Sequence, residues 1–265
     1  MTVNKKGDFV LQVFILDVSN YIKFLSKKEI DILKKFFSKV LLHYIFTIKY
    51  GLKSKKIFVQ KSKNGKLYLR GCYKNIFFNI SHSKGLIAIA ISNSEIGIDV
   101  ENIKGSAYLK NIDKYDLVFQ KKEIDFIKLA KNKYIAFYKI WTLKESIVKL
   151  LDKNLGYMDK FSIFNFANSK LVKLQNLTFV DKCGNLYLFS VASLKHFQKP
   201  ILQKIDFEQL LLHIKFSKFC KLFVKDCLKD NFVSFYEILV ILQSIFNRGG
   251  EQYGKFCFKS SRFCN

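Results

Sequence analysis

The chain has 265 residues, of which 49% are hydrophobic, with 28 Phe and 13 Tyr. This length and composition allow a sizeable core in one large domain or two small ones, and they exclude general disorder. Lys and Arg number 46 against 21 Asp and Glu, a formal net charge of +25. Such a balance favours an anionic partner, which could be nucleic acid, a phosphate-rich cofactor, an acidic protein or an anionic membrane surface.

Cysteine and histidine patterns give little support to a structural zinc site. The six cysteines form no CxxC pair, and the chain has only four histidines. Scattered cysteines in a chain of this size are typical of a reduced, cytosolic protein, so we expect a cytoplasmic location. The apolar runs at residues 9–16 and 232–246 are short and include polar residues. We therefore expect neither a signal peptide nor stable membrane insertion.

The first hundred residues predict mostly strands, with one early helix. A strand at residues 10–16 precedes a helix whose N-cap is Ser26, with Glu29 three residues later in a capping box. The dipeptide Asn64-Gly65 is a turn signal between two short strands. The other strands are expected at residues 57–60, 67–69, 77–80, 86–92 and 96–101, with a turn at 81–83.

The second hundred residues predict helices before strands. Helices are expected at about residues 121–131 and 134–151, and strands at 161–166, 177–180 and 186–192. Each half thus combines helical material with mostly sequential strands, which favours an α+β fold. The polar segment at 102–112 is a plausible boundary. We therefore expect an N-terminal half at 1–104, a C-terminal half at 105–212 and a basic, aromatic, helix-compatible extension at 213–265.

Two acids share one face of the strand at 96–101. In the sequence IGIDVE the apolar residues alternate with Gly97, Asp99 and Glu101, so the two carboxylates stand side by side. They repel each other unless a positive charge lies between them, and a hard divalent cation meets that need. Gly97 on the same face would leave room for a ligand. The alternative is an exposed strand with two solvated acids.

The helix at about 134–151 carries a second polar face. Trp141, Glu145 and Lys149 recur every four residues, on a different face from the apolar side chains. An ordinary surface pair between Glu145 and Lys149, with Trp141 as a core anchor, would explain this spacing equally well.

Five segments together resemble the Sfp-type 4′-phosphopantetheinyl transferase family. IGIDVE at 96–101 and WTLKESIVK at 141–149 resemble its paired signature. Upstream, FNISHS at 78–83 is similar to its third conserved block and NGK at 64–66 to its glycine–lysine turn. FQKKE at 119–123 resembles an acid-bearing stretch of the family.

The resemblance extends over about residues 9 to 212, and it implies an enzyme of two similar α/β halves. These halves would form a pseudo-twofold arrangement with coenzyme A in the cleft between them and a C-terminal helical extension beyond. The implied activity is that of a holo-[acyl-carrier-protein] synthase. It transfers 4′-phosphopantetheine from coenzyme A to a serine of an apo acyl or peptidyl carrier protein, with Mg²⁺, and releases 3′,5′-ADP. We expect a monomer whose basic surface attracts the acidic carrier.

The resemblance also implies a metal site and a catalytic base. Asp99, Glu101 and Glu145 would hold the magnesium. The attacking serine hydroxyl must lose a proton, so a carboxylate near the metal is the expected base. Glu145 is the first candidate and Glu123 the second, and the sequence does not separate them.

Binding of coenzyme A is implied for five further positions. Lys149 would neutralise the departing pyrophosphate, and Lys144 would assist it. His82, with Ser81 and Lys66, would grip the phosphates of the nucleotide end.

Two other functions stay open at this point. The surface rich in Lys and Phe could bind nucleic acid, although the chain has no recognisable RNA-binding signature. A degenerate transferase fold acting as a binding scaffold is the other alternative. The sequence does not indicate which carrier-dependent pathway is served.

Overall fold

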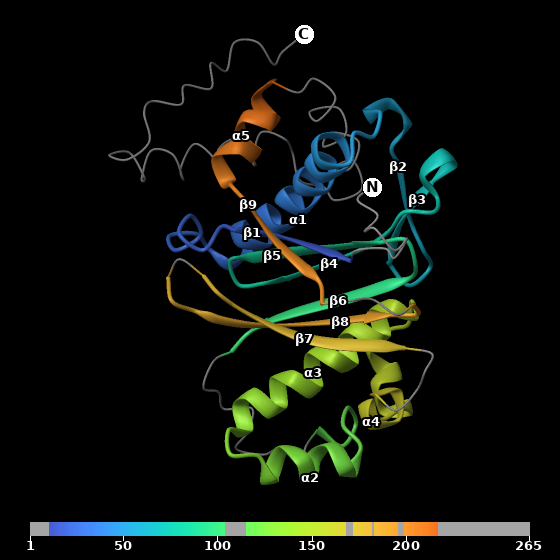
Figure 1. The fold of residues 1–265 in the computed structure, drawn as a ribbon. Helices are drawn as coiled ribbons and strands as arrows, with labels where there is room; N and C mark the ends of the chain where they lie inside the picture. The colour runs from blue at the N-terminus through green and yellow to red at the C-terminus, as the bar shows by residue number, and fades with distance from the viewer. Residues whose placement is uncertain (1–10, 104–114, 168–171, 182, 196–198, 217–265) are drawn as a thin grey trace.

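The computed structural model describes residues 11–103, 115–167, 172–181, 183–195 and 199–216. Runs of strands and runs of helices follow one another along the chain, which is the pattern of the predicted α+β class (Figure 1). The strands are β1 Gln12–Asp17, β2 Phe58–Lys61, β3 Leu67–Arg70, β4 Phe77–Ser83, β5 Leu86–Ser92, β6 Ile96–Asn102, β7 Lys173–Val180, β8 Leu186–Ser193 and β9 Ile201–Ile205. The helices are α1 Lys27–Tyr44, α2 Lys121–Leu129, α3 Lys133–Leu150, α4 Ile163–Ala167 and α5 Phe207–Phe216.

The elements form four layers (Figure 1). Helices α1 and α5 cover the outer face of a sheet in the order β4-β5-β1-β9. A second sheet, in the order β6-β8-β7, lies against the inner face of the first, and α3 covers its outer face. The β2–β3 hairpin projects from one side. The strands β4 and β6 are edge strands of their sheets, and they meet between the two halves of the molecule.

Three apolar cores follow from the alternation of side chains along the strands. In β1, Phe14 and Leu16 pack under α1, while Val13 and Ile15 point into the space between the two sheets. The third core lies between the second sheet and the helices α2, α3 and α4. Because both sheets are covered on both faces, their central strands are almost wholly buried.

Local signals predicted several elements well. Ser26 caps α1, and the Glu29 carboxylate accepts a hydrogen bond from the Ser26 backbone N–H at 2.7 Å, which confirms the capping box. The Asn64-Gly65 turn joins an antiparallel hairpin, and Gly65 has φ +97°. That angle lies in the region that glycine adopts freely, so the turn signal was correct.

The strand expected at residues 161–166 is wrong, because this segment contains the short helix α4. The backbone N–H of Phe164 donates to the Ser162 hydroxyl at 3.3 Å where the helix begins. The rings of Phe161 and Phe166 pack against each other, with centroids 5.1 Å apart, whereas Phe164 packs on Phe126. Tertiary aromatic contacts thus explain a spacing that resembled strand alternation.

The turn expected at residues 81–83 is also wrong. These residues complete β4, where Ser81 pairs with Ala88 and Ser83 pairs with Leu86 of β5. The reversal comes one residue later, at Lys84, which has φ +48°.

Strand β9 and helix α5 were not predicted, and they pack with the first sheet although they follow the second in sequence. The expected extension at 213–265 lies outside the described residues, apart from the end of α5. None of the helices in the described segments is long and apolar enough to cross a membrane.

Candidate active site

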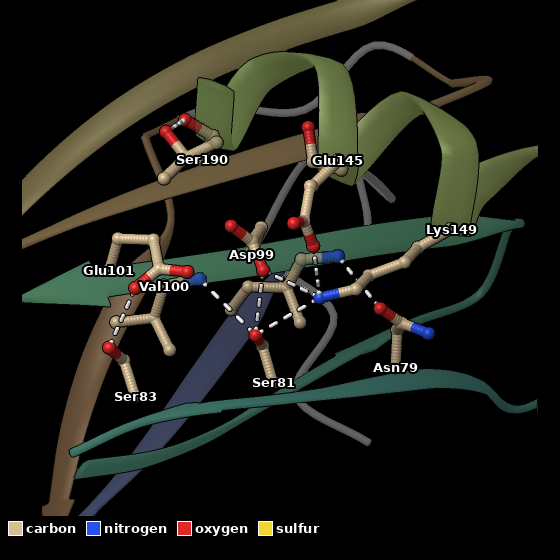
Figure 2. A network of polar contacts seen from close by, with 12 residues as sticks. Asn79, Ser81, Ser83, Asp99, Val100, Glu101, Glu145, Lys149 and Ser190 are labelled. Atoms are coloured by element: carbon tan, nitrogen blue, oxygen red, sulfur yellow. Dashed lines mark hydrogen bonds and ion pairs between the residues drawn. The ribbon is translucent and has the colours of Figure 1, made fainter. Parts of the chain in front are cut away.

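Three carboxylates converge where β6 passes beneath α3. Asp99 and Glu101 come from β6 and Glu145 from α3, and one ligand oxygen from each lies within 4.8 Å of the others (Figure 2). Asp99 is buried, and the other two are partly buried. The alternation of β6 predicts that Asp99 and Glu101 share a face, and the helix brings the third acid to the same point.

Gly97 allows α3 to come this close. A Cβ built on Gly97 would stand 1.9 Å from the carbonyl oxygen of Ser146, closer than real Cβ atoms come. Ser146 follows Glu145, so the contact fixes the height of Glu145 above Asp99. We expected Gly97 to leave room for a ligand, but the helix backbone occupies that space.

Lys149 places its ammonium among the acids. Its Nζ lies 2.6 Å from Asp99 Oδ1 and 3.4 Å from Glu145 Oε2. Burial works to lower the pKa of Lys149, but the carboxylates of Asp99 and Glu145 outweigh it and raise the pKa. Lys149 is therefore charged at neutral pH.

The acids still outnumber the base. Burial, and then the charge of Asp99, raise the pKa of Glu145 to about 7, while Lys149 opposes the shift. Burial and the Asp99 charge raise the pKa of Glu101 as well. Burial is the larger cause of both shifts, and the neighbouring carboxylate of Asp99 adds to it; a divalent cation would offset that repulsion.

A buried oxygen in the cluster fits this interpretation. Asp99 Oδ1 accepts hydrogen bonds from Ser81 and Lys149, whereas Asp99 Oδ2 is buried with no hydrogen-bond partner among the described residues. Such an oxygen carries a cost unless something binds it. Three clustered carboxylates with a free buried oxygen fit a hard divalent cation such as Mg²⁺.

A basic groove of about 350 Å³ begins beside the cluster. Three of the residues predicted to bind coenzyme A line it, namely Lys66, His82 and Lys149. Lys35, Lys39 and Lys153 line it too, and Asp152 is the acid among the described residues of its lining. Such a surface attracts phosphate groups.

Lys66 is held at the groove by two contacts. Its ammonium lies 2.6 Å from Glu95 Oε2 and donates to the carbonyl oxygen of Leu150 at 2.9 Å. Because Leu150 is the last residue of α3, Lys66 joins the β2–β3 hairpin to the end of that helix.

Asp152 and Lys153 were not predicted from the sequence. Asp152 has φ +51°, its side chain accepts from the Ser62 hydroxyl at 2.8 Å, and its carbonyl oxygen accepts from Asn64. A polar residue just after an apolar helix is a signal for a left-handed helix end, and it could have located this junction. Lys153 follows it into the groove.

Ser81 does not face the groove as predicted. Its side chain is 5% exposed, and its hydroxyl donates to Asp99 Oδ1 at 2.8 Å. The Ser81 hydroxyl oxygen also accepts from Lys149 Nζ at 3.1 Å. Ser81 therefore contacts the acidic cluster, and its predicted role in gripping phosphate does not fit this geometry.

Lys144 and Glu123 also lie elsewhere. Both side chains are fully buried, and Lys144 Nζ lies 2.9 Å from Glu123 Oε2. Lys144 also donates to the carbonyl oxygen of Phe161 at 2.6 Å, and Glu123 accepts from the backbone N–H of Ile163 at 2.7 Å. The pair joins α2 and α3 to the segment that begins α4. Neither residue can contact a phosphate or a substrate hydroxyl in this arrangement, because no side-chain surface is exposed.

An aromatic pocket of about 270 Å³ lies at the opposite end of the acidic cluster from the groove. Glu101 lines it together with Tyr115, Phe137, Tyr138 and Trp141. The ring of Trp141 stacks on that of Phe137, with an interplanar angle of 13°. Along α3, Trp141, Glu145 and Lys149 thus lead from an aromatic pocket through the acids to a basic groove.

Comparisons with known proteins agree with the predicted family. Residues 95–187 match the family model described as the 4′-phosphopantetheinyl transferase superfamily. The transferase psf-1 of Bacillus pumilus is 28% identical over 134 residues, which cover 48% of this chain and 54% of that protein. The transferase gsp of Aneurinibacillus migulanus is 30% identical over 107 residues, covering 40% of this chain and 42% of that protein.

A third relative is the transferase Sfp of Bacillus subtilis strain 168, 36% identical over 90 residues. These cover 32% of this chain and 38% of that protein. The chain thus spans about half the length, or less, of the curated relatives it matches. The resemblance predicted from the sequence motifs is confirmed. Residues 95–187, which carry Asp99, Glu101, Glu145 and Lys149, are the part of the chain that is similar to the 4′-phosphopantetheinyl transferase superfamily.

Proposed function

We propose that this protein transfers the 4′-phosphopantetheine group of coenzyme A to a serine of an apo acyl or peptidyl carrier protein. The products are the holo carrier and 3′,5′-ADP. The observation that carries the proposal is the convergence of three carboxylates and Lys149 at the mouth of a basic groove. Transfer of a phosphoryl-linked group needs mainly positioning and charge neutralisation, and this arrangement supplies both.

Asp99, Glu101 and Glu145 would hold the Mg²⁺. When bound, the ion would neutralise pyrophosphate charge and polarise the phosphorus under attack. The unpartnered Asp99 Oδ2 and the excess negative charge of the cluster support this assignment.

The basic groove would bind the nucleotide end of coenzyme A. Lys66, His82 and Lys153 line the groove, and Lys149 stands between it and the acids. Because Lys149 is charged and next to the cluster, it would stabilise the negative charge that develops on the departing phosphate.

Glu145 would accept the proton of the carrier serine. Its carboxylate is partly buried and stands beside the acids that would hold the metal, where the reaction needs a group to take the serine proton. Glu123, the second candidate in the sequence, is paired inside the core and has no exposed surface. Of the two, only Glu145 lies at the acidic cluster.

The aromatic pocket beside Glu101 would receive the pantetheine arm. The arm is slender, with aliphatic stretches between its two amides, and Trp141 and its neighbours offer aromatic faces on the side of the acids away from the groove. The acidic carrier would approach from this end, attracted by the net positive charge of the chain.

We also propose that the two sheets are the two halves of a pseudo-twofold arrangement. Each sheet carries one helix of 18 residues on its outer face, α1 on the first and α3 on the second. The monomeric state stays a prediction. The cytoplasmic location stays a prediction.

The test is a direct assay. Purified protein with coenzyme A and Mg²⁺ should convert an apo carrier protein to its phosphopantetheinylated form, as seen by intact-mass spectrometry. Glu145→Gln should lower the rate at least about 100-fold, since it removes the base and a metal ligand. No adduct on several unrelated carriers would contradict the proposal. Equal behaviour of Glu145→Gln and the wild type would favour a binding scaffold.

A further inference from the structure

Strand β4 contacts β6 through a row of polar side chains (Figure 2). Asn79 Oδ1 accepts a hydrogen bond from the backbone N–H of Ile98 at 2.9 Å. Two residues on, the hydroxyl of Ser81 accepts from Val100 N–H at 3.3 Å. The next hydroxyl in the row, that of Ser83, accepts from Asn102 N–H at 3.1 Å.

The spacing explains why these contacts form a row. Side chains at every second position of a strand point to the same side, and the outward N–H groups of an edge strand also recur at every second residue. Three oxygens of β4 therefore satisfy three N–H groups at the edge of β6, and they join the two sheets without a backbone ladder. Edge strands otherwise leave such groups unpaired.

The two serines make a further contact that Asn79 does not. The Ser81 hydroxyl donates to Asp99 Oδ1 at 2.8 Å, and the Ser83 hydroxyl donates to Glu101 Oε2 at 2.8 Å. A hydroxyl has one proton and two lone pairs. Because a backbone N–H occupies one lone pair, the proton is left to point at the carboxylate.

We propose that Ser81 and Ser83 are positioning residues that set the orientation of Asp99 and Glu101 for the metal ion. Each hydroxyl links a backbone N–H of β6 to the carboxylate one residue earlier on that strand. Each serine thus ties its acid to the β6 backbone through β4. Asp99 Oδ1 is held in this way, and its buried second oxygen is left for the cation. The inference rests on the proposed function only in taking these carboxylates as metal ligands.

Asn79 provides a control for the alternative that the polar side chains of β4 only join the two sheets and do not orient the acids. Asn79 satisfies an N–H of β6 as the serines do, and no contact of its side chain with the acids is found among the described residues. Asn79→Ala therefore removes one connection between the sheets and leaves both carboxylates held. Ser81→Ala and Ser83→Ala remove a connection and the hydrogen bond to an acid together.

The experiment measures Mn²⁺ affinity by electron paramagnetic resonance, with and without coenzyme A, for these variants and Ser83→Thr. Urea unfolding gives the stability of each variant. We expect Ser81→Ala and Ser83→Ala to weaken Mn²⁺ binding about tenfold or more, the usual effect of removing a group that orients a metal ligand. Asn79→Ala should lose similar stability and keep the wild-type Mn²⁺ affinity in the measurement without coenzyme A, which is the decisive one because Asn79 also lines the basic groove. Ser83→Thr, which retains the hydroxyl, should bind Mn²⁺ with the wild-type affinity.

Three results would overturn the inference. They are equal loss of affinity in all three alanine variants, unchanged affinity in both serine variants, and no Mn²⁺ binding by the wild type. The transferase assay is independent of these results. If the affinities separate as expected and no carrier is modified, the positioning role stands and the proposed function fails. If carriers are modified and the serine variants bind Mn²⁺ normally, only the positioning role fails.

Discussion

The backbones of Gly97 in β6 and Ser146 in α3 are in direct contact, so close that a side chain at position 97 would not fit between them. A Cβ on Gly97 would also lie 2.6 Å from the backbone nitrogen of Leu150. The two elements that carry the three acids are therefore in direct contact at a position without a side chain. The acidic cluster of Asp99, Glu101 and Glu145 therefore depends on this close packing of α3 on β6.

Gly97→Ala should disturb both stability and activity. The added methyl group meets helix backbone, which cannot rotate away, so α3 must move or unfold locally. Overpacking of this kind costs about 1 to 3 kcal/mol or more. We expect a lower midpoint in urea unfolding and a fall in transferase rate, because Glu145 moves away from Asp99.

Gly156→Ala is the matched control. Its added Cβ would lie 3.3 Å from Asn154 Oδ1, a side-chain atom, and its backbone φ is not positive. This variant should unfold near the wild-type midpoint. If both variants unfolded alike, the packing of α3 on β6 would not be the reason for glycine at position 97.

Lys149→Met should reduce transfer while preserving most of the side-chain volume. The substitution removes the ammonium that lies 2.6 Å from Asp99 Oδ1 and borders the groove. We expect kcat/KM to fall at least about 100-fold, since a charge that stabilises the departing phosphate is lost.

Lys160→Met is the comparison for Lys149→Met. Lys160 is exposed and pairs with its neighbour Asp159, away from the acidic cluster and the groove. Its loss removes the same formal charge from the protein. Steady-state kinetics that showed equal losses for both variants would mean that net charge, and not the position of Lys149, accounts for the effect.

The buried pair of Glu123 and Lys144 should be needed for stability. Lys144→Met leaves the Glu123 carboxylate buried without its partner, at a cost of about 3 to 5 kcal/mol. The double variant Glu123→Gln/Lys144→Met removes both charges and should recover part of that loss in urea unfolding. A Glu123→Gln protein of wild-type stability that transferred nothing would contradict this and make Glu123 a candidate base again.

Stability should fall as the pH drops from 6.5 towards 4, partly because of His43. This residue of α1 is 1% exposed; its Nδ1 lies 3.0 Å from His213 Nε2 of α5, and its Nε2 lies 2.8 Å from the Ser54 hydroxyl. Burial, and then the charge of His213, lower the pKa of His43 to about 4. In this pH range His43 is therefore protonated in the unfolded chain and neutral in the folded protein, so a falling pH favours the unfolded state.

We expect this effect to cost about 1 to 2 kcal/mol at pH 5 relative to pH 7.5, since one pKa unit corresponds to about 1.4 kcal/mol. The measurement is urea unfolding of the wild type and of His43→Gln at several pH values. The stability difference between the two proteins should shrink as the pH falls through this range. A difference that stayed constant between pH 7.5 and 4.5 would contradict the assignment.

The sequence predicted what depends on neighbouring residues along the chain. The capping box at Ser26, the turn at Gly65 and the alternation of β6 each need only local geometry. Helical periodicity also puts Glu145 and Lys149 on one face, where they lie 3.4 Å apart. The same periodicity places Lys144 about 100° around the helix axis from Glu145. This rotation away from the polar face could have indicated that Lys144 lies in the core.

Other features needed the tertiary structure. The role of Ser81 depends on β4 lying beside β6, which no local pattern shows. The helix α4 stands where a strand was expected, and Phe164 in it packs on Phe126 of α2, a contact between distant parts of the chain. Gly97 was expected to leave room for a ligand, and only the fold shows that the backbone of α3 takes that space.

The parallel pairing of β9 with β1 affects how the protein forms during synthesis. Residues 201–205 lie beside the first strand and close that edge of its sheet. A nascent chain that has already made β1, β4 and β5 must therefore wait until residue 205 has left the ribosome before that sheet is complete. The other sheet needs nothing beyond Ser193. A fragment cut just after the first half would leave one side of β1 open to pairing with other chains, so the first half can be isolated intact only together with the later strand.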